Sequence, residues 1–427
     1  MGSGALLFSV SLGRYARTLL RSGVPELLRR NDPRRPFAIF SPGAHDAAFR
    51  EEFSHLSPVS FHELEKEAFG QVPWERALWK LCVSAQRQPA LFRGAMGLHH
   101  TVYQRIRPVH YRKAFEALRP ALLVTASAGF STTLDVPLIR EARTAGVPVL
   151  YVVHSWDNLN GLKGLMLERP DRLAVWNDRM KQQAVERYHY RPDQVEVVGA
   201  LQMDLYQAPE TFLSREAFFR QLGLDPARPM ILLATGMPEL DCGYLVEAVL
   251  RVLKENRFDG PPQLVCRAHP LEPHGYEAFD SVPGLVMDRF AHISNGLGWN
   301  PPLAESRHVA NLVRHAAVVI NVASTITLEA MLADTPTINV AYDPIHPADF
   351  TRHIHQDHWG RHFIPVEASG ATCIVRDEAE LAAGIGEALR APAERRSARR
   401  QLAGTLVGPL DGAAHRRVAA LIEGMLR

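Results

Sequence analysis

The chain has 427 residues, of which 46% are hydrophobic and 22% are charged, and its formal net charge is +2. This composition excludes a largely disordered chain, and the near balance of charge gives no electrostatic basis for a nucleic-acid-binding protein. The length suits two or three domains, each large enough to bury a core.

The N-terminal 35 residues are basic, with seven arginines against Glu26 and Asp32. Such a segment fits either a peripheral contact with an anionic membrane or a solvated helix face, and the second is the commoner case. The apolar run Ala5–Val10 is too short for a secretory signal, and no stretch has the length of a membrane span. The four cysteines are widely spaced, so we expect reduced thiols and a cytoplasmic protein.

Short apolar runs alternate with helix-like stretches and predict buried parallel strands. In the first half of the chain these runs are Phe37–Phe40, Ala121–Ala126, Val147–Val153, Leu173–Trp176 and Val195–Leu201. In the second half they are Met230–Ala234, Leu264–Arg267, Leu285–Met287, Val318–Val322, Thr337–Ala341 and Cys373–Val375. The alternation predicts an α/β protein with two Rossmann-like, doubly wound domains.

A polar, proline-containing segment over residues 208–229 predicts the domain boundary near residue 210, so that the domains cover 1–210 and 211–427. The stretch Trp74–Leu118 has no strand pattern and predicts helices inserted in the first domain. Ligands of open α/β sheets bind outside the carboxyl ends of the strands. We therefore expect the binding site in a cleft between the two domains.

A polar loop follows the predicted strand Val147–Val153. It contains an imidazole, an indole, a carboxylate, an amide and a cation, which are His154, Trp156, Asp157, Asn158 and Lys163. This set is typical of a carbohydrate or phosphate site, and Asp157 or His154 is placed to act as a general base. The alternative is a turn that Asp157 caps, with Trp156 packed in the core.

Two strand ends in the second domain carry candidate phosphate ligands. Arg267 and His269 emerge from the strand Leu264–Arg267 and offer donors that suit phosphate oxygens. Gly236 follows the strand Met230–Ala234 and permits close approach of the backbone to a ligand. A histidine after a strand is more often structural, so His269 also fits a packing role.

A third candidate is the segment that runs from the strand Val318–Val322 into a helix. Ser324, Thr325 and Thr327 offer hydroxyls at the start of that helix, where backbone N–H groups favour anions. Glu329 follows on the first turns and suits the hydroxyls of a sugar. The alternative is a helix cap in which Glu329 complements the helix dipole.

The histidines of residues 353–362 carry a weaker metal signal. His358 and His362 have helical spacing, but Gly360 lies between them and no paired carboxylate stands out. The chain also lacks an Asp-x-Asp motif. We expect no essential metal and no cofactor.

Several motifs together resemble a known family. They are S-W-D-N-L-N-G-L-K-G, D-R-L-A-V-W-N-D, V-V-G-A-L-Q-M-D, C-R-A-H-P, A-S-T-I-T-L-E-A and D-G-A-A-H-R-R. In order and spacing they resemble nucleotide-sugar glycosyltransferases of the GT-B fold, nearest to the CDP-glycerol glycerophosphotransferase and surface-polysaccharide branch. The resemblance covers roughly Ala121 to Arg417.

The resemblance implies that the second domain binds a nucleotide diphosphate donor and the first domain binds the acceptor. It implies diphosphate contacts for Ser324, Thr325 and Thr327, a ribose contact for Glu329, and phosphate contacts for Arg267 and His269. Asp411, Gly412 and Arg416 match a terminal motif near the donor, and His358 matches an element lining the cleft. Asp157 stands where the glycerophosphotransferases have a histidine suggested as the base, so glycerol phosphate is in doubt as the transferred group.

The resulting hypothesis is transfer of a sugar or polyol phosphate to a hydroxyl of a cell-surface glycan or lipid-linked acceptor. Asp157 is the expected base, and His154, Trp156, Asn158 and Lys163 line the acceptor side. One alternative is an enzyme like UDP-N-acetylglucosamine 2-epimerase, which needs no second substrate. Another is a non-catalytic glycan-binding subunit. The nucleotide, the sugar, the acceptor and the stereochemical outcome are not encoded in any motif.

Overall fold

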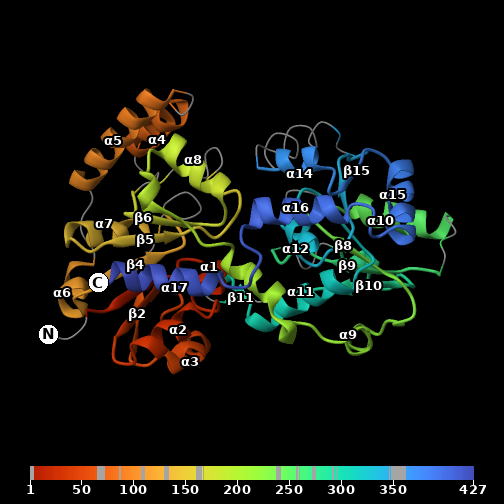
Figure 1. Ribbon diagram of the computed structural model, residues 1–427, viewed down its shortest axis with the longest axis horizontal. Helices are drawn as coiled ribbons and strands as arrows, with labels where there is room; N and C mark the ends of the chain where they lie inside the picture. The colour runs from red at the N-terminus through yellow and green to blue at the C-terminus, as the bar shows by residue number, and fades with distance from the viewer. Residues whose placement is uncertain are drawn as a thin grey trace. The chain divides into compact units, whose positions relative to one another are not determined.

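The structure is a computed structural model of the chain (Figure 1). It describes residues 4–64, 73–85, 88–106, 111–128, 134–159, 166, 168–236, 242–255, 258, 260–271, 276–290, 293–294, 296–345, 347 and 362–427. Two compact units are present. Unit 1 comprises Met1–Gln202, Ile293–Asn300 and Ala413–Arg427, and unit 2 comprises Met203–His292 and Pro301–Gly412.

Unit 1 is built on a seven-stranded sheet of order β3-β2-β1-β4-β5-β6-β7, and its strands pair in parallel. The strands are β1 (Leu6–Ser9), β2 (Phe37–Ser41), β3 (Val59–Glu63), β4 (Leu122–Thr125), β5 (Val149–Val152), β6 (Arg172–Val175) and β7 (Val195–Val197). The strand order reverses between β1 and β4, which makes their carboxyl ends the expected ligand position.

The helices of unit 1 cover both the sheet and its edge. They are α1 (Gly13–Leu19), α2 (Val24–Asn31), α3 (Ala47–Phe53), α4 (Pro73–Ala85), α5 (Pro89–Ile106), α6 (Arg112–Leu118), α7 (Val136–Thr144), α8 (Asp178–Tyr188) and α17 (Ala414–Met425). The stretch predicted as helical, Trp74–Leu118, thus holds α4, α5 and α6. Helix α8 begins where the Asn177 side chain accepts the Met180 backbone N–H, an N-cap at the end of β6.

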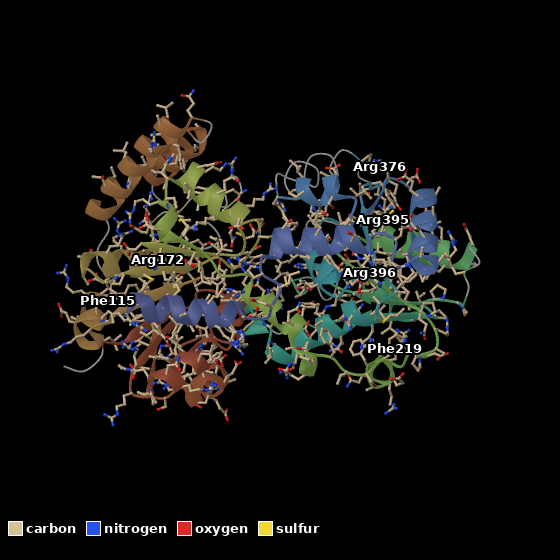
Figure 2. All side chains as sticks on the ribbon, viewed as in Figure 1. Phe115, Arg172, Phe219, Arg376, Arg395 and Arg396 are labelled. Atoms are coloured by element: carbon tan, nitrogen blue, oxygen red, sulfur yellow. The ribbon has the colours of Figure 1, made fainter. Side chains whose placement is uncertain are left out.

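Unit 2 has a six-stranded sheet of order β10-β9-β8-β13-β14-β15, also parallel. Its strands are β8 (Met230–Ala234), β9 (Gln263–Arg267), β10 (Leu285–Asp288), β13 (Val318–Asn321), β14 (Thr337–Val340) and β15 (Cys373–Val375). Its helices include α9 (Arg215–Leu222), α10 (Gly243–Glu255), α11 (Leu303–His315), α12 (Ile326–Leu332), α14 (Ile364–Ser369), α15 (Glu378–Arg390) and α16 (Arg396–Val407). Phe219 of α9, labelled in Figure 2, belongs to the core of this unit.

The two parallel-sheet units confirm the predicted α/β class with two doubly wound sheets. The run Ala5–Val10, which the sequence analysis weighs only as a signal segment, contains the central strand β1, and Leu6, Leu7 and Phe8 are fully buried there. Burial on both faces by flanking strands and helices explains its unbroken apolar character.

Two segments that follow the predicted boundary near residue 210 fold with unit 1. One is the hairpin of β11 (Ile293–Ser294) and β12 (Gly298–Trp299), and the other ends in α17. Leu297 of the hairpin is 1% exposed in the unit 1 core and accepts a 2.9 Å hydrogen bond from the Gly13 backbone N–H. A Cβ at Gly13 would lie 2.3 Å from the Trp299 carbonyl oxygen, so only glycine permits this contact.

Helix α17, the blue helix at the C-terminus, packs against α2 (Figure 1). Val418 and Ile422 of α17 are buried in the unit 1 core. Arg417 also donates a 2.8 Å hydrogen bond from Nε to the Val198 carbonyl oxygen. The C-terminal helix is therefore part of the unit 1 core despite its place in the sequence.

Candidate functional site

A cluster of hydroxyls surrounds a buried carboxylate at the switch point of the unit 1 sheet. Ser9 ends β1, Ser11 follows it, and both donate hydrogen bonds to the carboxylate of Asp135. Thr125, at the end of β4, donates a third bond of 3.1 Å. Asp135 is fully buried, so it joins the loop after β1 to the end of β4 without touching solvent.

Burial controls the charge of this carboxylate. Desolvation raises the pKa of Asp135 to about 6, and the three hydroxyl hydrogen bonds offset only part of that effect. No motif in the sequence marked this cluster, because Ser9 and Asp135 are 126 residues apart. Its physical role is to fix the backbone beside the position where a ligand of this sheet binds.

His154 follows β5 and is held by its ring and its backbone. Its Nδ1 lies 3.2 Å from the Ala126 carbonyl oxygen, and its ring packs edge-on against Tyr15 with the centroids 4.6 Å apart. Gln202 donates a 2.7 Å hydrogen bond from Nε2 to the His154 carbonyl oxygen. Because a carbonyl can only accept, the ring carries its proton on Nδ1 and presents a lone pair at Nε2.

The charge state of His154 follows from its surroundings. Burial, together with the positive charge of Arg14, lowers the pKa of His154 to about 3, and Asp157 opposes this effect. The ring is therefore neutral near pH 7 and binds a proton weakly. This favours His154 as a hydrogen-bonding group and leaves Asp157 as the better candidate for a base.

Asp157 lies in a turn directly after β5. The Ser155 hydroxyl donates a 2.5 Å hydrogen bond to Oδ1 of Asp157, while the Ser155 backbone N–H bonds to Oδ1 of Asn158 at 3.0 Å. Asn158 is 3% exposed and Trp156 is 6% exposed, whereas Asp157 is only half-buried. Asn158 thus caps the turn and Trp156 packs in the interior, so Asp157 is the acidic group of the turn that reaches the surface.

The second sheet has its own switch point, between β8 and β13. Thr235 and Gly236 follow β8, and the Thr235 hydroxyl accepts a 2.8 Å hydrogen bond from the His269 backbone N–H. His269 is half-buried, and its Nδ1 accepts the Leu271 N–H at 3.3 Å. The neutral His269 ring then carries its proton on Nε2, which suits an anionic ligand.

A buried network organises the end of β13. Oδ1 of Asn321 accepts from the Ser324 backbone N–H, the Thr327 hydroxyl and Nδ2 of Asn339, at 3.0, 3.1 and 3.2 Å. Thr327 and Asn339 are both fully buried, and Nδ2 of Asn339 also donates to the Thr327 hydroxyl at 3.0 Å. The hydroxyl of Thr327 is therefore committed to the interior of the unit.

The candidate donor ligands nearest this network differ in exposure. Ser324, Thr325 and Glu329 are half-buried, in contrast to Thr327. Ala323 precedes them with φ = 42°, a left-handed conformation that a residue with a Cβ rarely adopts. The turn thus presents Ser324 and Thr325 at the carboxyl end of β13 on a backbone held away from its ordinary conformation.

Arg267 lies inside unit 2 and not at an open surface. It is 5% exposed, its Nη1 donates to Asp288 at 2.8 Å, and its Nη2 donates to Glu305 of α11. Burial alone would raise the pKa of Asp288, but the hydrogen bond from His308 and the charge of Arg267 lower it below its ordinary value. This geometry favours a structural role for Arg267 over the predicted phosphate contact.

The remaining predicted residues lie apart from these clusters or outside the described residues. Asp411 is exposed in unit 2 and Arg416 is exposed on α17 of unit 1. Gly412, between them, has φ = 64°, and a Cβ there would lie 2.9 Å from Cβ of Gln207. Lys163 and His358 lie outside the described residues.

The described part of the chain contains no group of three or more His, Cys, Asp or Glu residues arranged to hold a metal ion. Of the four histidines in the run 353–362, the structure describes only His362. No described helix combines the length and apolar character that a membrane span requires.

Several N-terminal arginines are bound within unit 1. Arg21 pairs with Glu52 at 2.6 Å, Arg29 donates to the Leu56 carbonyl oxygen at 2.6 Å, and Arg35 donates to the Gly4 carbonyl oxygen at 3.0 Å. Arg30 and Arg34 are exposed. The basic segment therefore presents fewer exposed cations than its sequence suggests.

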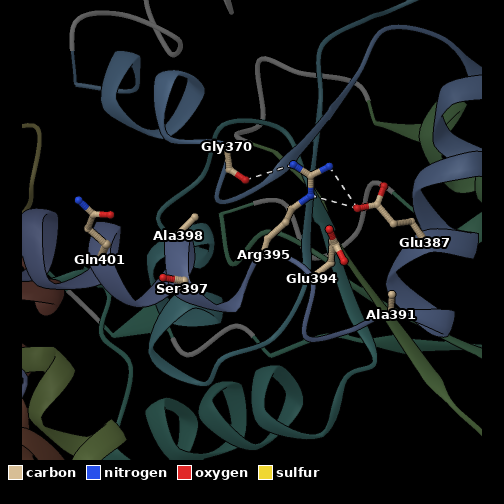
Figure 3. Close-up of a pocket in the computed structure, with 8 residues that line it drawn as sticks. All are labelled: Gly370, Glu387, Ala391, Glu394, Arg395, Ser397, Ala398 and Gln401. Atoms are coloured by element: carbon tan, nitrogen blue, oxygen red, sulfur yellow. Dashed lines mark hydrogen bonds and ion pairs between the residues drawn. The ribbon is translucent and has the colours of Figure 1, made fainter.

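A hollow of about 660 Å³ lies between α15 and α16 (Figure 3). Arg395 spans it, donating from Nε to Glu387 and from Nη1 to the Gly370 carbonyl oxygen, both at 3.1 Å. Gly370 precedes β15, so the hollow is beside the amino end of that strand. The candidate ligands Thr235, Gly236, Ser324 and Thr325 are instead at carboxyl ends, so this hollow is not the predicted site.

Comparison with known proteins places this geometry in context, although no family model matches the chain. A lipid-A-disaccharide synthase from Syntrophotalea carbinolica is 29% identical over 203 residues, which are 47% of this chain and 46% of that protein. The chain thus spans about half the length of this curated relative.

Solved structures match nearly the whole chain. The UDP-GlcNAc 2-epimerase from Methanocaldococcus jannaschii gives a TM-score of 0.56 at 14% identity, covering 98% of this chain and 99% of that one. The wall teichoic acid polymerase TagF gives 0.58 at 11% identity, covering 99% and 89%. UDP-GlcNAc 2-epimerase from Neisseria meningitidis bound to UDP-GlcNAc gives 0.55 at 12% identity, covering 98% and 99%. The chain has the fold of these proteins, the GT-B fold of two Rossmann-like units.

Proposed function

We propose that this chain is a glycosyltransferase that moves a sugar, or a polyol phosphate, from a nucleotide-activated donor to a hydroxyl of a cell-surface glycan or lipid-linked acceptor. The GT-B fold and the partial likeness to a lipid-A-disaccharide synthase support the class of reaction. The observation that carries the proposal is the half-buried Asp157 carboxylate, held by Ser155 directly after β5 and next to a neutral His154.

Unit 1 supplies the acceptor side. Asp157 takes the proton of the acceptor hydroxyl as its oxygen attacks the donor. His154 presents a lone pair at Nε2 and accepts a hydrogen bond from the acceptor. Trp156 and Asn158 shape the turn from inside, because both are buried. This replaces their predicted direct contact with the acceptor by a positioning role.

Unit 2 supplies the donor side. The hydroxyls of Ser324 and Thr325 and the Nε2 proton of His269 offer hydrogen bonds to the diphosphate as its bond to the sugar breaks and negative charge accumulates on it. Gly236 lets the backbone after β8 approach the ligand. Glu329 accepts from ribose hydroxyls in this proposal. Asp411 and Arg416 enter only through the family resemblance.

No resident cofactor is part of this proposal, because the nucleotide-activated donor is itself a substrate. Transfer of the glycosyl group balances when Asp157 accepts the hydroxyl proton and the nucleotide diphosphate departs with the electron pair of the broken bond. The epimerase alternative uses the same kind of donor but needs no acceptor, and two of the similar solved structures are epimerases.

A nucleotide-binding screen tests the proposal. Purified protein is melted with UDP, CDP, CMP, GDP, dTDP or ADP, each with and without magnesium. A bound nucleotide at about 100 times its Kd adds about 2.7 kcal/mol to the free energy of unfolding. We expect one base to raise the melting temperature without magnesium. A protein that responds to none of them supports the non-catalytic glycan-binding alternative.

A further inference from the structure

The helices inserted in unit 1 differ in charge from the rest of the chain. Residues 76–115 contain no Asp or Glu and carry eight Lys and Arg residues, Arg76, Lys80, Arg87, Arg93, Arg105, Arg107, Arg112 and Lys113. Outside this stretch the acidic residues outnumber the basic ones, because all 46 Asp and Glu residues but only forty of the 48 Lys and Arg residues lie there. The positive charge of the protein is therefore concentrated around α4 and α5.

The hairpin of α4 and α5 is anchored by one face. Cys82 and Ala85 of α4 are buried against Phe92 and Ala95 of α5. Phe92 also packs edge-on against Tyr188 of α8, with the ring centroids 6.2 Å apart. The pair of helices projects from unit 1 next to α8 (Figure 1).

The opposite surface of the hairpin exposes leucines. Leu81 is 47% exposed, Leu91 is 58% exposed and Leu98 is 49% exposed. Three of the nine exposed large hydrophobic residues that the structure describes thus lie on these two helices. Leu91 and Leu98 are seven residues apart, so they lie on one face of α5. Lys80 and Arg93 are exposed beside them.

We propose that the α4–α5 hairpin docks unit 1 on the surface of an anionic lipid bilayer. Exposed leucines and cations without any acidic residue are the pattern of helices that lie in the plane of a membrane interface, where leucines enter the acyl boundary and Lys and Arg meet anionic headgroups. The N-terminal arginines are poorer candidates, because Arg21, Arg29 and Arg35 are bound to other groups of unit 1. This contact goes beyond the proposed transferase activity and does not depend on it.

Vesicle flotation of the full chain tests the docking surface. The vesicles consist of phosphatidylcholine alone or with about one-third phosphatidylglycerol. We expect binding to the anionic vesicles only. The double variant L91Q/L98Q and the double variant K80E/R93E should each lower the partition coefficient by roughly tenfold. All four positions are exposed, so the fold and its melting temperature should be unchanged.

Two matched controls separate this surface from general effects of charge and hydrophobicity. R30E/R34E makes the same charge change at exposed positions of the N-terminal segment, and L213Q/L271Q removes two leucines of unit 2 that are 41% and 47% exposed. Both should bind the anionic vesicles within about twofold of the wild type. Equal binding to both kinds of vesicle, no binding to either, or a loss confined to R30E/R34E would overturn the proposal.

Discussion

The hydroxyl of Ser155 donates a 2.5 Å hydrogen bond to Oδ1 of Asp157, within the turn that follows β5. The bond fixes the direction of the carboxylate and stabilises its charged form, which must accept a proton only as the acceptor oxygen attacks. The backbone N–H of Ser155 is held by Asn158, so both ends of this bond are fixed by a turn packed on the buried Trp156.

Replacing Asp157 with Asn should lower kcat/KM for transfer by about 10² to 10⁴, because the amide cannot accept the proton of the acceptor hydroxyl. Nucleotide affinity, measured by calorimetry, should stay within about twofold of the wild type since Asp157 is in unit 1 and the donor ligands are in unit 2. Ser155→Ala is the matched variant and should retain more activity than D157N. Transfer by D157N at the wild-type rate would rule out Asp157 as the base.

The β13 turn makes opposite predictions for neighbouring hydroxyls. Thr327→Val should lower the free energy of unfolding by about 1 to 3 kcal/mol, because it removes a partner of two buried asparagines, but it should leave nucleotide affinity unchanged. Ser324→Ala with Thr325→Ala should weaken nucleotide binding with little loss of stability, since both residues are half-buried. Chemical denaturation and calorimetry on the two proteins measure both quantities. The reverse pattern would place the donor contact on Thr327.

The pattern of buried parallel strands was predictable because such strands are apolar over their whole length. β3 was not, since its sequence V-S-F-H-E is polar at an edge of the sheet and only half-buried. The return of α17 to unit 1 has no local signal either, because it depends on the fit of Val418 and Ile422 into a core built from the first half of the chain.

The candidate site was predictable only where its residues are neighbours in sequence. Asp157, His154 and Ser324 stand directly after apolar strands, which marks them as strand-end residues. The role of Arg267 depends on Asp288 and Glu305, which are 21 and 38 residues away. An arginine at a strand end resembles a phosphate ligand until those carboxylates are placed beside it.

Asp135 should make stability depend on pH. Its pKa is about 6 in the folded protein, above the ordinary value of 3.8. A raised pKa in an acid means that the folded state holds the proton more tightly, so the stabilisation is fully present below the pKa of the unfolded chain and is lost as pH rises through the folded pKa. From about pH 4 to about pH 7, this group should remove about 3 kcal/mol from the free energy of unfolding.

Asp135→Asn isolates this effect, because the amide does not titrate and every other group is shared by the two proteins. Urea denaturation of both proteins across this pH range should show the wild type losing stability relative to D135N. Parallel curves for the two proteins would mean that Asp135 titrates at its ordinary pKa.

Removing Arg267 should destabilise unit 2. Arg267→Met leaves Asp288 and Glu305 buried without their cation, which should lower the free energy of unfolding by about 3 to 5 kcal/mol. Arg251→Met is the matched control, because Arg251 pairs with Glu378 at the surface and should contribute under about 1 kcal/mol. Denaturant midpoints measure both. Equal midpoints for R267M and wild type, combined with weaker nucleotide binding, would restore Arg267 as a phosphate ligand.

The central claim is transfer from a nucleotide-activated donor to an acceptor hydroxyl. Its most direct test incubates the nucleotide sugar whose base stabilises the protein, first alone and then with a lipid-linked or glycan acceptor, and follows the products by mass spectrometry and NMR. We predict an intact donor when it is alone, and release of the nucleotide together with a glycosylated product when the acceptor is present. An epimerised nucleotide sugar formed without any acceptor would contradict the account.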